Sequence, residues 1–117
     1  AMKEAEPLMN GATGVVCAND LCAFGALSRL QETGVSVPDG VSVTGFDDIA
    51  FSRFCSPALT TIRQPTYTMG RQAVKAIVHM REFHTLPAPT MFATELVVRA
   101  STGPRPSAVG EVWKQAI

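Results

Sequence analysis

Two adjacent carboxylates, Asp47 and Asp48, are the residues of this sequence best placed to bind a small molecule. They follow the short alternating apolar run at 41–44, a pattern typical of a strand. Open α/β sheets bind ligands at the carboxyl ends of their strands, where a carboxylate can accept hydrogen bonds from vicinal hydroxyls or a base amine. A second strand-like run, 59–62, leads to Gln64. A ligand between these strand ends would meet Asp47 from one side and Gln64 from the other.

The same pair of carboxylates could instead hold a metal ion, as in phosphoryl-transfer folds. Against this, the sequence shows no nucleophile with a base partner, and the glycines at 11–14 precede a strand instead of following one. The three cysteines are odd in number and stand in apolar contexts, which favours reduced core residues over a disulfide, and none has a partner at zinc-ligand spacing. We therefore expect no enzyme, no metal and no cofactor.

The elements that must position these side chains can be predicted from local patterns. After a strand at 14–18, Asp20 is expected to be the N-cap of a helix over 21–31 whose apolar face holds Leu21, Phe24, Leu27 and Leu30. Gly34 fits the position after the helix, and a turn at 37–40 leads to the next strand. This βαβ order predicts an α/β fold, with a parallel sheet and helices on both faces.

Beyond this unit we expect a helix from Thr66 to about Phe83, a strand within 91–99 and a flexible tail from 103. The 117 residues suit one domain or part of one. Ten basic and ten acidic residues cancel, without a basic stripe that would bind a phosphate backbone. No apolar run approaches the roughly 20 residues of a membrane span, and no secretory leader is visible. We expect a cytoplasmic location.

A set of phrases in fixed order resembles the lactose/galactose-repressor family of transcription regulators. The phrases are Val16–Asp20 (VCAND), Phe24–Leu27 (FGAL), Val41–Asp48 (VSVTGFDD), Pro57–Pro65 (PALTTIRQP) and Leu96–Thr102 (LVVRAST). The resemblance implies a partial periplasmic-binding-protein-like (type I) core, with residues 1–102 forming the C-terminal portion of the effector-binding and dimerisation domain. The DNA-binding headpiece and the first half of the core are expected to lie outside this sequence, and 103–117 is expected to be a tail.

The resemblance also implies roles for particular residues. The position of Asp47 contacts effector in the family, and that of Asn19 lines the effector cleft, although Asn19 could equally satisfy nearby backbone groups. Gln64 is either a cleft residue or a plain polar crossover between lobes, and Asp48 is expected to cap the turn or face solvent. Family members pair through the regions matching 20–33 and 49–57, so we expect Phe51, Phe54 and Cys55 at a dimer interface.

The implied function is sensing of a sugar, nucleoside or related metabolite by a homo-oligomeric regulator that reaches DNA only through its headpiece. The alternative is a periplasmic sugar-binding protein of a transport system, which shares the two-lobed fold. In the regulators, the helix matching 66–83 packs against the other lobe. Met69, Ala73, Ile77 and Met80 therefore form an unpartnered apolar stripe in this chain, and we expect the chain to self-associate through it.

Overall fold

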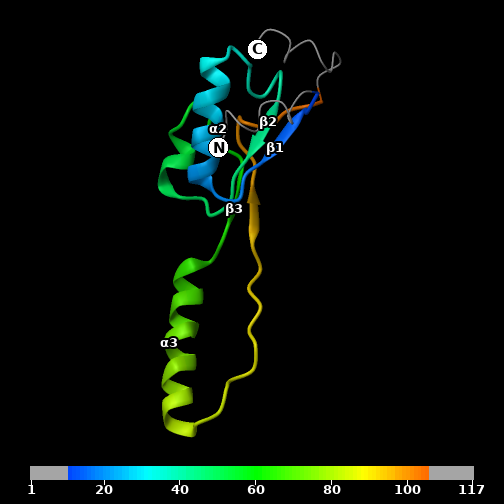
Figure 1. Cartoon of the computed structure of the whole chain (residues 1–117). Coiled ribbons are helices and arrows are strands. Elements are labelled where there is room, and N and C mark those ends of the chain that lie inside the picture. The colour runs from blue at the N-terminus through cyan, green and yellow to red at the C-terminus, as the bar shows by residue number, and fades with distance from the viewer. Residues whose placement is uncertain (1–10, 106–117) are drawn as a thin grey trace.

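The computed structural model describes residues 11–105, which form a body and one projecting arm (Figure 1). The body comprises residues 11–63 and 95–105, and the arm comprises residues 66–94. The elements in chain order are β1 (Gly14–Val16), α2 (Asp20–Glu32), β2 (Ser42–Thr44), the short 3-10 helix η2 (Ala50–Arg53), β3 (Thr61–Arg63), α3 (Thr66–Phe83) and β4 (Glu95–Val97). The βαβ unit and the bounds of the long helix are as predicted.

The strands line up in the order β1, β2, β3, β4. β1 and β2 are parallel, with Val16 paired to Thr44. β3 joins them through single parallel bridges, Thr44 to Thr60 and Asp47 to Arg63, and β4 runs antiparallel to β3. The α/β class is therefore confirmed. Within residues 11–105 helix α2 covers one face of the sheet, while Val16 on β1 is 87% exposed.

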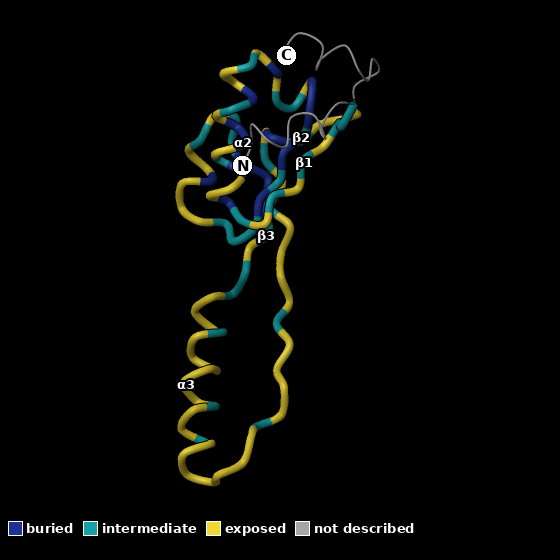
Figure 2. The backbone as a smooth tube through the Cα atoms, viewed as in Figure 1, coloured by how far each residue is buried: buried dark blue, intermediate teal, exposed yellow. Residues whose placement is uncertain are grey.

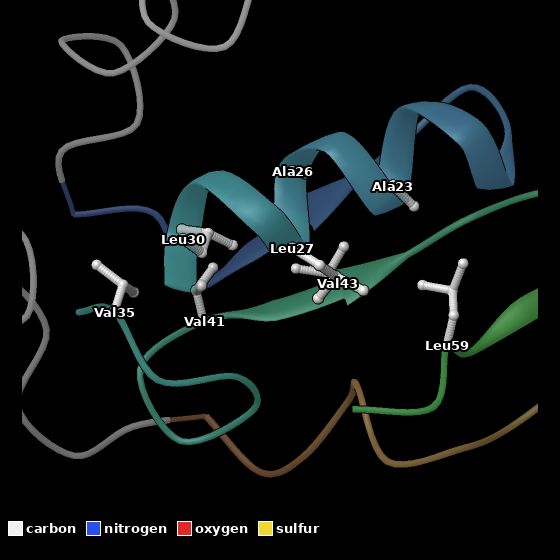
Figure 3. Close-up of a cluster of buried hydrophobic side chains, with 8 residues drawn as sticks. All are labelled: Ala23, Ala26, Leu27, Leu30, Val35, Val41, Val43 and Leu59. Atoms are coloured by element: carbon white, nitrogen blue, oxygen red, sulfur yellow. The ribbon is translucent and has the colours of Figure 1, made fainter. Parts of the chain in front are cut away.

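The core lies between α2 and the sheet. It is formed by four residues of α2 and four from the strands and loops beneath it, namely Ala23, Ala26, Leu27, Leu30, Val35, Val41, Val43 and Leu59 (Figure 3). The predicted helix face was partly wrong, because Leu21 is 70% exposed and Phe24 only half-buried. Ala23 and Ala26 are almost fully buried, and their small side chains let the helix backbone lie close to the strands.

The ends of α2 follow from hydrogen bonding of backbone groups that have no partner within the helix. Asn19 is the N-cap, and its Oδ1 accepts the N–H of Cys22 at 2.8 Å, so the prediction that Asp20 is the cap was wrong. At the other end Gly34 has φ +73°, the left-handed conformation predicted for the residue that ends the helix. Val35 N–H then bonds Leu30 O at 2.9 Å, which closes the last turn.

The returning chain is fixed to the body by a buried serine. Ser101 is fully buried, and its Oγ donates to Val43 O at 2.6 Å and accepts the N–H of Thr60 at 2.8 Å. Its carbonyl accepts the N–H of Val43 at 2.8 Å. A single residue therefore binds both β2 and the segment before β3, while the antiparallel pairing of β3 with β4 brings the two ends of the arm together.

The arm is mostly exposed, with a few half-buried positions and none that is buried (Figure 2). No residue of α3 is buried, and Ile77 on its apolar stripe is 66% exposed. Residues 84–94 run back beside the helix to β4 (Figure 1). Within residues 11–105 the stripe is not buried, although Met69 and Ala73 face the return segment across a groove, and the self-association inferred from it stays a prediction. No helix in the described part of the chain is long and apolar enough to cross a membrane.

Candidate functional site

Three polar residues follow three neighbouring parallel strands. Asn19 and Asp47 each stand three residues beyond the paired residues Val16 and Thr44, so the sheet register brings them to the same edge. A backbone hydrogen bond of 2.9 Å from Asp20 N–H to Phe46 O joins the two segments there. Gln64 follows β3 at the same edge, next to the bridge between Asp47 and Arg63. The predicted convergence at the carboxyl ends of the strands is therefore present.

Asp47 and Gln64 are in direct contact. Gln64 Nε2 donates to Asp47 Oδ1 at 2.6 Å, and both residues are half-buried. Asp47 Oδ2 and Gln64 Oε1 accept no hydrogen bond from any residue within 11–105, and the amide nitrogen of Asn19 donates none to these residues. Two free acceptors and one free donor are suited to hydroxyl or amine groups of a ligand. The ligand-binding roles of Asn19, Asp47 and Gln64 stay predictions.

The backbone at this strand end is unusual. Asp47 has φ +112° and Asp48 has φ +53°, and residues other than glycine adopt positive φ infrequently. Asp47 N–H donates to Ile62 O at 2.9 Å, and Asp48 N–H donates to Thr61 Oγ1 at 3.4 Å. Such conformations persist where the surroundings hold them, and they gather at ligand sites. The two peptide hydrogen bonds to β3 are part of what holds this turn.

Asp48 does not face solvent, and the prediction that it caps a turn or is solvated was wrong. Its carboxylate is 4% exposed and forms ion pairs with Arg63 Nε at 2.7 Å and Arg99 Nη2 at 2.6 Å. Arg63 also pairs with Glu95 at 3.1 Å. Burial by itself would raise the pKa of Asp48, but the hydrogen bonds and charges of Arg99 and Arg63 outweigh it, so the pKa lies below its ordinary value.

A second carboxylate joins three parts of the body behind the candidate site. Asp20 is fully buried and accepts hydrogen bonds from Ser52 Oγ at 2.6 Å, from Ile49 N–H at 2.9 Å and from Thr61 Oγ1. A side chain at Gly45 would collide with it, so glycine is required there. Sequence reasoning missed this role, because the partners are 29 or more residues away along the chain. The acidic residue after a strand was the only signal.

The residues predicted for a dimer interface lie on and next to η2. Phe51 is 56% exposed and Phe54 is 74% exposed, and Phe51 also packs edge-on against Phe24 with ring centroids 5.2 Å apart. Cys55 is half-buried, and its thiol lies toward Ser52 O and Pro57 O, each at 3.3 Å. The two phenylalanines are thus available to a partner. Their place in an interface stays a prediction.

The cysteines are free thiols, but they are not all core residues. Cys22 is exposed, contrary to expectation, while Cys17 is half-buried. Burial raises the pKa of the Cys17 thiol, and the nearby Cys22 adds to the effect. No group of three or more metal-ligating side chains occurs within residues 11–105.

A groove on the arm does not include the candidate residues. It has a volume of about 770 Å³ and runs between α3 and the return segment 87–92, and none of Asn19, Asp47 and Gln64 lines it. Its walls are mostly small or apolar, including Met69, Ala73, Ala76, Pro87 and Phe92. Lys75 is its only ordinarily charged lining residue, and such a groove offers little specificity to a polar ligand. We therefore place the candidate ligand site at Asp47.

Comparisons with known proteins match the chain to regulators. Residues 1–102 match the model of the periplasmic binding protein-like domain family. The chain is 39% identical over 103 residues to the HTH-type transcriptional repressor CytR of Escherichia coli, covering 87% of this chain and 30% of that protein. The chain thus spans less than a third of the length of this curated relative.

Solved structures agree with the sequence match. The complex of the transcriptional regulator CelR with cellobiose superposes with a TM-score of 0.80 at 33% identity, over 86% of this chain and 31% of that one. A LacI family regulator from Enterococcus faecium with bound ribose gives a TM-score of 0.77 at 34% identity, over 88% of this chain and 39% of that one. These relatives are transcriptional regulators and not enzymes. The chain belongs to the family of periplasmic binding protein-like domains, in the form carried by LacI-type transcriptional regulators.

Proposed function

We propose that this chain is the C-terminal portion of the effector-sensing and dimerisation domain of a bacterial DNA-binding transcription regulator. The observation that carries the proposal is the contact between Asp47 and Gln64 at the sheet edge, with free polar atoms beside it, in a chain whose relatives are regulators. DNA binding belongs to a headpiece outside residues 1–117, and such a regulator acts in the cytoplasm, where bacterial DNA lies. The transport protein alternative is not favoured by these relatives.

The effector is a sugar, nucleoside or related metabolite. Asp47 Oδ2 and Gln64 Oε1 accept hydrogen bonds from its hydroxyl or amine groups, and the amide of Asn19 donates one. Cellobiose and ribose in two structural relatives support this ligand class. Binding between two lobes would shift their relative orientation, because the ligand has different contacts in the open and closed states.

The arm provides the mechanical link in this proposal. α3 carries an exposed apolar stripe and is joined to the body through β3 and β4, so we assign it to a second lobe. Residues 1–102 form the C-terminal portion of the two-lobed core, and 103–117 form the tail. Gly103 N–H still bonds Ser42 Oγ on the body at 3.1 Å, whereas residues 106–117 lie outside the described part. Pairing of two subunits through Phe51, Phe54 and Cys55 makes the protein a homo-oligomer.

The test is ligand binding by the full-length protein. A thermal-shift screen of sugars, nucleosides and small metabolites identifies the effector, and calorimetry then compares wild type with Asp47→Ala. We expect the variant to bind about 1.5–3 kcal/mol more weakly, the range for a hydrogen bond to a charged group. Asp39→Ala, at an exposed turn position, is the control and should bind normally. Unchanged affinity in Asp47→Ala would remove this residue from the site.

A further inference from the structure

Asp48 joins both chain segments that connect the body to the arm. Arg63 lies on the outgoing strand, three residues before α3 begins, and its Nε is 2.7 Å from Asp48 Oδ2. Arg99 lies two residues beyond β4 on the returning chain, and its Nη2 is 2.6 Å from Asp48 Oδ1. Each carboxylate oxygen therefore holds one of the two connecting segments.

The same carboxylate stands next to the strained residue of the candidate site. Asp47, with φ +112°, shares a planar peptide bond with Asp48, which has φ +53°, so contacts that fix Asp48 also restrict the backbone of Asp47. The Asp48 side chain is 4% exposed, whereas Asp47 is the residue with a free carboxylate oxygen at the sheet edge. Adjacent carboxylates therefore have separate tasks, one facing the connecting segments and the other facing the candidate ligand space.

We propose that Asp48 is the positioning residue of this site: its ion pairs with Arg63 and Arg99 hold the left-handed turn that presents Asp47 and fix the two connecting segments to the body. For the ligand, this rests on the proposed function. The backbone conformation of the turn at Asp47 and Asp48 is unfavourable by itself. Without the negative charge of Asp48 the ion pairs are lost, and the turn should leave this conformation more often. Ligand contacts at Asp47 and the direction of the arm are thereby governed by one turn.

Amide hydrogen exchange on the full-length protein without ligand tests the positioning role. Asp48→Asn keeps the size of the side chain and removes its charge, so exchange of the Asp47 and Arg99 amides should become about tenfold faster or more. Amides within α2 should be unchanged, which separates release of the turn from general unfolding. The matched control is Glu95→Gln, which removes only the exposed pair to Arg63 and should exchange as wild type.

Two further variants keep the proposal falsifiable. Asp48→Gly accepts φ +53° without strain, so it should still exchange faster if the carboxylate is what holds the turn. Should Asp48→Asn fail to fold, Arg63→Gln removes one of the two pairs at a half-exposed arginine and should give a smaller increase at the same amides. Wild-type exchange in Asp48→Gly, or an equal increase across α2 in these variants, would overturn the proposal.

Binding then separates this proposal from the proposed function. With cellobiose, ribose and the nucleosides of the screen as probes, any compound that binds wild type should bind Asp48→Asn at least about fivefold more weakly. If wild type binds and Asp48→Asn matches it in both affinity and exchange, the positioning role fails and the proposed function stands. If no probe binds wild type but exchange of the Asp47 amide becomes faster in Asp48→Asn, the proposed class of effector is wrong and the positioning role of Asp48 is retained.

Discussion

Replacement of Asp20 by alanine should be among the most destabilising single changes in the body. The carboxylate is fully buried and accepts three hydrogen bonds, from Ser52, Ile49 and Thr61. Asp20→Ala leaves three donors, two of them buried hydroxyls, without this acceptor, at about 1–3 kcal/mol for each buried donor that finds no other partner. Because the two hydroxyls can rotate toward other oxygens, we take a total of about 3–5 kcal/mol, a large share of the 5–15 kcal/mol typical of a domain.

Urea unfolding of the full-length protein measures this loss as a lower midpoint at unchanged slope. Asp20→Asn keeps one oxygen to accept from Ile49 and Ser52, so it should lose only about 1–2 kcal/mol. The exposed Asp39→Ala should lie within about 0.5 kcal/mol of wild type. If Asp20→Ala lost less than about 1 kcal/mol, the three hydrogen bonds would not be the connection that we infer between α2, η2 and β3.

Three further outcomes are expected. The folded pKa of Asp48 lies below its ordinary value of 3.8, so its contribution to stability is present above about pH 4 and is lost as pH falls through the folded pKa. Asp48→Asn lacks this contribution, so its free energy of unfolding should fall less steeply than that of wild type as the pH is lowered below about 4. Phe54→Asp should shift the full-length protein toward monomer in sedimentation velocity, and an unaltered dimer would count against the interface. The 117-residue chain alone should scatter light as a dimer or larger, since Ile77 on α3 is 66% exposed; a clean monomer at high micromolar concentration would refute association through α3.

Elements with a local cause could be predicted from the sequence. The βαβ order, the bounds of α3 and the left-handed Gly34 follow from apolar periodicity and from residues that end helices, and all of these patterns lie within a few neighbouring positions. The meeting of Asp47 with Gln64 was also predictable, because the carboxyl ends of parallel strands share one edge. The choice between Asn19 and Asp20 as the N-cap was wrong, since both residue types suit that position and only the backbone decides between them.

The pairing of charges could not be predicted in the same way. Asp48 and Arg99 are 51 residues apart in the chain, and Thr61 is 41 residues from Asp20. Which acidic residue meets which partner depends on the register of strands and on the return of the chain after the arm. Asp47 and Asp48 look alike in sequence, yet one has a free oxygen at the sheet edge and the other is enclosed by two arginines.

The sequence by itself therefore determined the kind of fold, the strand end where polar residues gather and the family that the chain resembles. Only the tertiary structure decided that Asp47 has a free carboxylate oxygen, that Asp48 pairs with two arginines and that Asp20 is buried among hydroxyl groups. The physical reason is that periodicity and capping act over one or two turns of chain, whereas the ionic and hydrogen-bonding environment of a side chain is set by segments brought together through folding.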